Sequence, residues 1–104
     1  MKGLQELSFQ ILSNVGEAKS CYIESMEIAR DGDFVAAVEK IVEGEKHFLE
    51  GHRAHMQMVQ SAGSEEKPIN LLIAHAEDQM MATDTIKIVA KEMIEVYKLI
   101  HSKL

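Results

Sequence analysis

Residues 71 to 82 read Leu71-Leu72-Ile73-Ala74-His75-Ala76-Glu77-Asp78-Gln79-Met80-Met81-Ala82. In a helix, His75 and Asp78 lie one turn apart, on a face shared by side chains three and four residues apart. The same face continues as a mostly apolar stripe through Leu71, Ala82, Thr85 or Ile86, Val89, Met93, Val96 and Ile100. Burying an imidazole and a carboxylate in such a stripe costs several kcal/mol unless each has a partner. We therefore take His75 and Asp78 as candidate functional residues.

The helix that contains this stretch is predicted over residues 68–101, because Pro68 suits a first helical turn. Two earlier helices are predicted over 4–30 and 34–61. In the first, apolar residues follow three-and-four steps at Leu4, Leu7, Ile11, Val15, Ala18, Tyr22, Met26 and Ala29. Between these two helices, Gly32 suits a left-handed turn and Asp33 suits an N-cap. The sustained loop signal is at 61–67. The pattern predicts an all-α, up-down-up hairpin of three helices.

The second predicted helix carries its large apolar residues on a side that we expect to face the core. They are Phe34, Val35, Val38, Ile41, Val42, Phe48, Leu49, Met56 and Val59. Gly44 and Gly51 are seven residues apart and so lie roughly on one side of that helix. Glycine in a helix indicates close approach of another backbone, and simple tolerance of glycine is the alternative.

The third predicted helix has a second apolar edge besides the stripe that contains His75. This edge runs through Leu72, Ala76, Met80, Ala90 and Tyr97. A three-helix hairpin can cover one edge and leaves the other for a neighbouring subunit. The surplus stripe predicts an obligate oligomer, without giving the number of subunits.

Composition excludes several classes of protein. A chain of 104 residues fits one domain, and 17 acidic against 11 basic residues, a net charge of −6, disfavours binding to nucleic acid. The lone Cys21 cannot form an internal disulfide, and no stretch reaches the roughly 18 apolar residues of a membrane span. The segment Met1 to Leu12 lacks the apolar run of a secretory signal. We expect a cytoplasmic protein.

His75 can perform chemistry that few side chains perform at neutral pH. Neutral imidazole is a nucleophile, and a phosphoryl group on its ring nitrogen remains energetic enough to be passed on. A carboxylate one turn away, as Asp78 is, can orient the ring or bind a cation. Spacing alone leaves a polar pair within a helix interface as an equal alternative.

Three more histidines, His47, His52 and His55, lie on the second predicted helix. His52 and His55 are one turn apart and can share a metal ion, although solvated or hydrogen-bonded side chains are the commoner case. The Glu-x-x-His pairs of a di-iron bundle are absent from the sequence, as are Cys-x-x-Cys and Gly-rich phosphate loops. His101 is expected to favour the negative end of the last helix.

The chain resembles a known family, the enzyme IIA component of the lactose/cellobiose (including chitobiose) branch of the bacterial phosphoenolpyruvate-dependent sugar phosphotransferase system. The resemblance covers nearly the whole chain. It includes Gly16-Glu17-Ala18-Lys19-Ser20, Gly32-Asp33-Phe34 and Ala54-His55-Met56-Gln57. Its most specific part is residues 71–81, which are similar to the family signature Leu-Leu-Val-His-Ala-Gln-Asp-His-Leu-Met.

This resemblance implies a phosphotransferase component that carries a phosphoryl group on histidine. In the family, the signature histidine accepts the group from phospho-HPr and passes it to a cysteine of the IIB component, which works with the membrane IIC component. His75 would be this acceptor and would form a tele-phosphohistidine. Sugar does not bind to the IIA component directly. The resemblance further implies a homotrimer in which Asp78 ligates one shared divalent cation, Mg²⁺ or another, since three carboxylates at an axis repel without a cation or protons.

Two positions depart from the signature. Glu77 replaces the usual glutamine and Gln79 replaces the usual histidine, and we expect Glu77 to face solvent or a cation rather than the phosphoryl group. Two alternatives stay open. One is a non-catalytic helical oligomerisation adaptor in which His75 and Asp78 fix the register of the helices. The other is a metal-binding bundle built on His47, His52 and His55.

Overall fold

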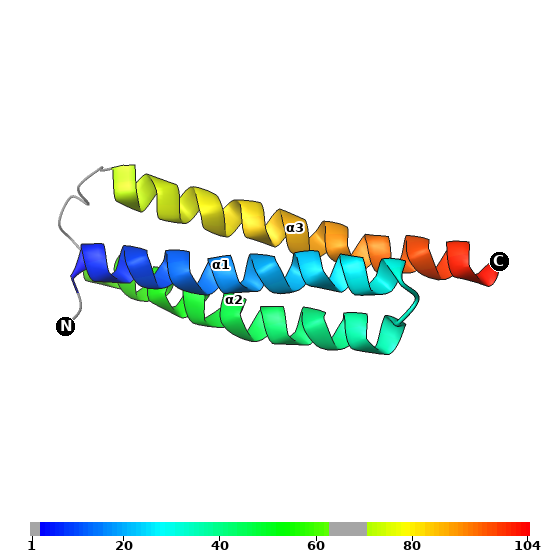
Figure 1. The fold of residues 1–104 in the computed structure, drawn as a ribbon. Helices are drawn as coiled ribbons and strands as arrows, with labels where there is room; N and C mark the ends of the chain where they lie inside the picture. The colour runs from blue at the N-terminus through cyan, green and yellow to red at the C-terminus, as the bar shows by residue number, and fades with distance from the viewer. Residues whose placement is uncertain (1–2, 63–70) are drawn as a thin grey trace.

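Three long α-helices make up the fold in a computed structural model, which describes residues 3–62 and 71–104. Helix α1 spans Leu4–Arg30, α2 spans Phe34–Ala62 and α3 spans Leu71–Ser102. Together they form a rod with extents of 59 × 19 × 17 Å. Figure 1 shows α2 running back beside α1, and α3 running in the same direction as α1. The predicted all-α, up-down-up architecture is confirmed.

The turn between α1 and α2 has the predicted chemistry. Gly32 has a φ of +95°, which is the left-handed region that glycine reaches without a steric penalty. Asp33 caps α2, since its Oδ1 accepts a 3.1 Å hydrogen bond from the backbone N–H of Ala36. At the other end, α2 continues through Ser61 and Ala62, two residues that the loop signal had included. The rest of that loop and the predicted start at Pro68 lie outside the described residues.

Helix α1 supplies the centre of the hydrophobic core. Its buried apolar residues are Leu7, Ile11, Val15, Ala18, Cys21, Tyr22 and Ala29. It packs along both other helices, whereas α2 and α3 touch each other much less. This arrangement leaves one long side of α2 and one long side of α3 without a neighbouring helix among the described residues.

The face of α2 that packs on α1 differs in part from the predicted one: Ile41 is buried and Phe34 and Phe48 pack against the core, as expected. Six residues placed on the core side are exposed: Val35, Val38, Val42, Leu49, Met56 and Val59. The side that is buried instead carries mostly small residues: Ala37, Ile41, Gly44, Gly51, Ala54 and Met58. Small residues let two helices approach closely, and the large aliphatic residues then form a second, outward stripe, which we call the α2 outer stripe.

Gly44 and Gly51 lie where α2 closely approaches α1. A Cβ atom at Gly44 would lie 2.6 Å from Cε1 of Tyr22 and 3.1 Å from Cβ of Cys21. At Gly51, a Cβ atom would lie 3.0 Å from Cγ1 of Val15. Close packing, rather than simple tolerance, therefore explains both glycines.

We expect Gly44→Ala to destabilise the protein. Overpacking of this kind costs about 1–3 kcal/mol, which exceeds or cancels the roughly 1 kcal/mol that alanine gains over glycine in a helix. Gly16→Ala is the matched control, because a Cβ atom at exposed Gly16 of α1 meets nothing within 4 Å. Urea unfolding at one fixed protein concentration measures both variants. Equal stabilisation by the two substitutions would contradict the close approach at Gly44.

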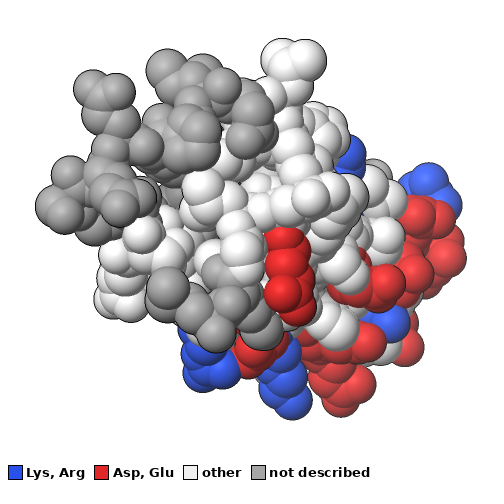
Figure 2. All heavy atoms as spheres, turned by 90° about the vertical axis from the view of Figure 1, so that its left-hand side faces the viewer, with Lys and Arg blue, Asp and Glu red and all other residues white. Residues whose placement is uncertain are grey.

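Helix α3 buries one of its two apolar edges. Ala76 and Ala90 are fully buried, and Leu72, Met80 and Tyr97 of the same edge are partly buried. The stripe that contains His75 and Asp78 points away from the core. We call this stripe, together with the exposed residues Met81, Ile88 and Leu99 beside it, the α3 outer stripe. Its other exposed apolar side chains are Leu71, Val89, Val96 and Ile100. Figure 2 shows the end of the rod where α3 begins. On this face of the molecule, the Lys, Arg, Asp and Glu side chains lie mainly below and to the right.

His101 fixes the far end of α3 to the turn between the other two helices. Its Nε2 donates a 2.9 Å hydrogen bond to the carbonyl oxygen of Arg30. Its ring meets the edge of the Phe34 ring at a centroid distance of 5.5 Å and covers Gly32. This tertiary contact goes beyond the interaction with the helix dipole that the sequence indicated. In the described part of the chain, no helix combines the length and the apolar character needed to cross a membrane.

Candidate functional site

His75 and Asp78 lie on the second and third turns of α3, and both are exposed. In the part of the chain that the structure describes, neither side chain makes a hydrogen bond or an ion pair. They share a shallow depression of about 550 Å³ whose lining residues are Leu71, Ala74, His75, Glu77, Asp78 and Met81. The helical spacing alone brings these side chains together. In the single chain, the imidazole in this position is open to solvent.

A groove runs beside this depression, between α2 and α3. Its volume is about 540 Å³, and its lining residues are Phe48, His52, His55, Glu77, Met80, Met81 and Asp84. The groove exists because α2 and α3 pack on α1 rather than on each other. Glu77 and Met81 line both the groove and the depression, so the two hollows adjoin at these side chains.

Glu77 turns toward α2 instead of toward free solvent. Its Oε2 lies 3.0 Å from Nε2 of His55, and the two side chains are 38% and 23% exposed. The sequence-based expectation that Glu77 faces solvent or a cation is therefore replaced by a contact across the groove.

If His75 accepts a phosphoryl group, as the resemblance implies, we expect Glu77→Gln to leave the transfer rate almost unchanged and to lower stability only slightly. A partly exposed ion pair contributes about 0.2–1 kcal/mol, and the Glu77 carboxylate is directed at His55 on α2. Transfer rates and thermal unfolding of the variant provide the measurement. Glu92→Gln makes the same change of charge on the exposed side of α3 as a control. A large rise in rate for Glu77→Gln alone would show that this carboxylate opposes the phosphoryl group.

The remaining histidines of α2 separate into two environments. His52 and His55 line the groove toward α3, whereas His47 lies against α1 with Cys21 and with Glu43, its neighbour one helical turn away. The structure thus does not gather His47, His52 and His55 in one place. The sequence analysis missed the group with Cys21. The sequence shows that Glu43 and His47 are four residues apart, but it does not show that Cys21 of another helix lies beside them.

Known proteins share this fold across its whole length. The crystal structure of the PTS cellobiose-specific enzyme IIA from Bacillus anthracis matches with a TM-score of 0.92 and 31% sequence identity, covering 100% of this chain and 96% of that chain. The structure of PtcA from S. mutans matches with a TM-score of 0.86 and 34% identity, covering 94% and 99%. The fold and the exposed histidine thus define a component of the sugar phosphotransferase system.

Sequence comparison narrows this class. The oligo-beta-mannoside-specific EIIA component of Bacillus subtilis is 35% identical over 95 residues, covering 90% of this chain and 86% of the relative. The lactose-specific EIIA component of Lactococcus lactis subsp. lactis is 33% identical over 93 residues, covering 88% and 89%. The family model described as "PTS system, Lactose/Cellobiose specific IIA subunit" matches residues 6–98. The chain belongs to the lactose/cellobiose-specific IIA family, which confirms the resemblance drawn from residues 71–81.

Proposed function

We propose that the protein is a cytoplasmic phosphocarrier. It accepts a phosphoryl group from phospho-HPr on His75 and passes the group to the cysteine of the cognate IIB component, which works with IIC in the uptake of a lactose-, cellobiose- or chitobiose-type sugar. The observation that carries this proposal is the exposed imidazole of His75, which makes no hydrogen bond or ion pair within the described residues, in a chain that the family model matches over residues 6–98. Because the relatives are named for different sugars, the proposal stops at this sugar class.

The proposed reaction is a direct displacement at phosphorus. The Nε2 lone pair of neutral His75 attacks the phosphoryl group, and the N–P bond to the HPr histidine breaks with its electron pair returning to that ring. In the second step, the IIB cysteine thiolate forms an S–P bond, and the N–P bond to His75 breaks. Such reactions need positioning and charge stabilisation more than covalent machinery. An exposed imidazole on a rigid helix meets the first requirement.

The surroundings of His75 suit the docking of a partner protein. The depression beside it contains the apolar side chains of Leu71, Ala74 and Met81, and the adjoining groove adds Phe48 and Met80. Methionine side chains adapt their shape, so one surface can receive two different partners in turn. We therefore place the docking surface for both HPr and IIB around this end of α3.

Transfer to IIB tests the proposed function directly. The chain is first phosphorylated, separated from the donor proteins and mixed with a IIB component of the same family. We expect the phosphoryl group to leave His75 and to appear on the IIB cysteine as a thiophosphate ester, seen by intact mass and by phosphorus NMR. Retention on His75 in the presence of folded IIB proteins of this family would contradict the carrier role.

We further propose that the functional unit is a homotrimer assembled through α3. The α3 outer stripe exposes seven large apolar side chains, and six more lie along the α2 outer stripe. Exposed apolar side chains in this number, along two helices, favour an association site. The family resemblance supplies the number three, because the stripes themselves indicate only that the chain associates.

Asp78 fits the role of a cation ligand in such a trimer. Its carboxylate is exposed on the α3 outer stripe, and it makes no hydrogen bond within the described residues, so both oxygens can serve as ligands. Carboxylate oxygens suit a hard divalent cation such as Mg²⁺. Three Asp78 side chains around one axis would hold the ion, whose positive charge would offset their mutual repulsion.

We expect removal of divalent cations to destabilise the assembled protein, and Asp78→Asn to abolish this effect. A cation present at 100 times its Kd stabilises the state that binds it by about 2.7 kcal/mol. Thermal unfolding with and without EDTA, together with the metal content per chain, gives the measurement. Asp84→Asn, on the same helix in the groove, is the control. An equal response to EDTA in Asp78→Asn and in the unmodified protein would contradict a cation at this position.

A further inference from the structure

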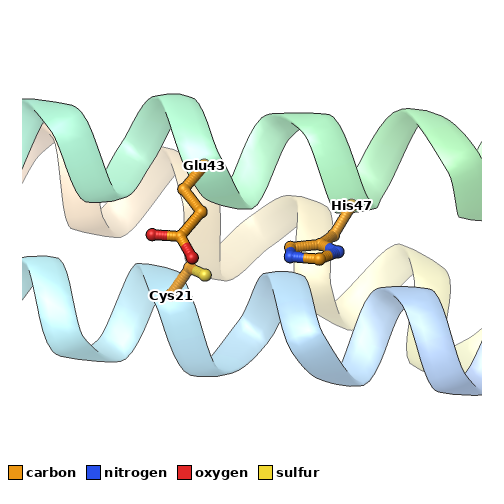
Figure 3. Close-up of side chains that lie close together, drawn as sticks. All are labelled: Cys21, Glu43 and His47. Atoms are coloured by element: carbon orange, nitrogen blue, oxygen red, sulfur yellow. The ribbon is translucent and has the colours of Figure 1, made fainter.

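Three potential metal ligands converge between α1 and α2, away from the site at His75. They are Cys21 of α1 and Glu43 and His47 of α2, and their ligand atoms all lie within 4.8 Å of one another. Figure 3 shows the Glu43 carboxylate beside the Cys21 sulfur, with an edge of the His47 ring turned toward both and with α3 behind. Nothing in the proposed phosphoryl transfer uses these side chains.

The fold brings the three groups together in a defined way. Glu43 and His47 are four residues apart, so they share one face of α2 one turn apart. Gly44 lies between them, where the missing side chain lets α1 approach, and a Cβ atom there would lie 3.1 Å from Cβ of Cys21. The thiol is held at the back, since Cys21 is 6% exposed, whereas His47 is half-buried and Glu43 is exposed. The cluster is thus open on one side to solvent.

From this geometry we propose a transition-metal site formed by Cys21, Glu43 and His47, suited to Zn²⁺ or an ion of similar chemistry. Thiolate, imidazole and carboxylate are the three ligand types that Zn²⁺ takes in proteins. In a tetrahedral site with bonds of 2.0–2.3 Å, ligand atoms lie about 3.5 Å apart. The observed separations of up to 4.8 Å need only a small contraction, which Glu43 and His47 can make by side-chain rotation. Water would complete the fourth position on the open side.

The negative charges around the cluster favour a bound cation, and they disfavour a Cys21 thiolate that has no cation beside it. Burial, together with the carboxylates of Glu43, Glu24 and Glu17, raises the pKa of the Cys21 thiol, and the Lys40 ammonium opposes this. A divalent metal would displace the thiol proton to solvent and would balance the thiolate and the Glu43 carboxylate, giving a neutral site. The Nζ atom of Lys40 lies 3.0 Å from Oε2 of Glu43 and 3.1 Å from Oε2 of Glu24. Because a carboxylate has two oxygens, Glu43 can keep Lys40 on one and offer the other to the metal.

The proposed site differs in chemistry and stoichiometry from a cation at Asp78. A sulfur and a nitrogen ligand select softer ions than carboxylate oxygens do. The site lies within one chain, so it would bind one ion per chain, whereas a cation shared at a threefold axis would bind once per three chains. These differences allow the two sites to be tested independently.

Titration of the full-length protein with Co²⁺ alone tests the proposal. Because Cys21 is the single cysteine of the chain, a thiolate-to-cobalt charge-transfer band in the near ultraviolet can come from no other residue. We expect this band, with visible bands of tetrahedral Co²⁺, to saturate at one ion per chain and to bleach on addition of Zn²⁺. Cys21→Ser should remove the band, and circular dichroism and thermal unfolding check that this variant is folded.

Variants of the other ligands separate a built site from a simple thiol adduct. His47→Gln and Glu43→Gln should each weaken Co²⁺ binding at least about tenfold. His52→Gln, which removes an imidazole from the groove on the same helix, and Asp78→Asn should leave the band unchanged. The proposal is overturned if no charge-transfer band appears. It is equally overturned if the band keeps its affinity in both His47→Gln and Glu43→Gln. Neither result would affect the phosphoryl acceptor role of His75.

Discussion

Replacement of His75 by glutamine is expected to abolish sugar phosphorylation in the reconstituted phosphotransferase system while leaving assembly intact. Glutamine keeps a polar side chain of similar size but has no nucleophilic nitrogen, so the rate should fall by at least about a thousandfold. His75 is exposed and unpartnered in the described part of the chain, so its loss should not unfold the protein. A coupled assay measures the rate of sugar phosphorylation, and light scattering of the same sample measures the assembly.

The same variant separates the phosphocarrier from the alternative of a non-catalytic adaptor. In an adaptor, His75 would only fix the register of the α3 outer stripe, and its replacement would disturb assembly first. His47→Gln is the matched control, because His47 lies against α1, away from the depression and the groove, and should not carry the phosphoryl group. If His75→Gln fails to assemble, and loses phosphorylation only because it no longer assembles, the phosphocarrier account is contradicted.

Val89→Glu is expected to dissociate the protein. Val89 lies on the α3 outer stripe and is 46% exposed in the single chain. Full burial of an exposed valine contributes about 1.5 kcal/mol or more, so burying the exposed part of Val89 contributes about half of that in each chain. The trimer would lose this contribution three times, and three unpaired charges near its axis would cost several kcal/mol more. The loss of 4 kcal/mol or more corresponds to roughly a thousandfold weaker assembly. Sedimentation velocity or light scattering at micromolar concentration measures the effect.

Ile23→Glu provides the control for this experiment. It places the same charge at an apolar residue of similar exposure, 40%, on α1, which carries neither outer stripe. We expect this variant to keep the size of the unmodified protein. If the unmodified protein is a stable monomer at micromolar concentration, both the association through α3 and the cation at Asp78 are wrong.

The sequence predicts the architecture well wherever local chemistry determines it. The periodic stripe of α1, the left-handed Gly32 and the N-cap at Asp33 all depend on neighbouring residues in the chain, and the structure agrees with each. The two apolar edges of α3 are also visible in the sequence. Which of them faces inward follows from packing against α1, and the structure buries the edge with Ala76 and Ala90.

The prediction for the core side of α2 was wrong at six of its residues because it relied on the size of apolar residues. Helix–helix distance is set by the smallest residues on a face, and Gly44 and Gly51 turn their side of α2 toward α1. The large residues Val35, Val42 and Leu49 are then left outside. When both sides of a helix are apolar, the sequence pattern does not show which side packs against a neighbouring helix.

The candidate site also has features that the sequence predicts and features that depend on the packing of the helices. The positions of His75 and Asp78 on one face follow from helical spacing, so the sequence could predict them. The contact of Glu77 with His55 and the convergence of Cys21 on Glu43 and His47 depend on how far one helix slides along another. That register is determined by packing and by the tie between His101 and Arg30, which no local pattern reveals.

Intact-mass spectrometry tests the central claim most directly. The full chain is incubated with phosphoenolpyruvate, enzyme I and HPr, in parallel with His75→Gln. The account predicts that the unmodified chain gains the mass of one phosphoryl group, that acid removes this group, and that the variant gains nothing. An unchanged mass while HPr itself becomes phosphorylated, or an equal gain in His75→Gln, would contradict the assignment of His75 as the phosphoryl acceptor.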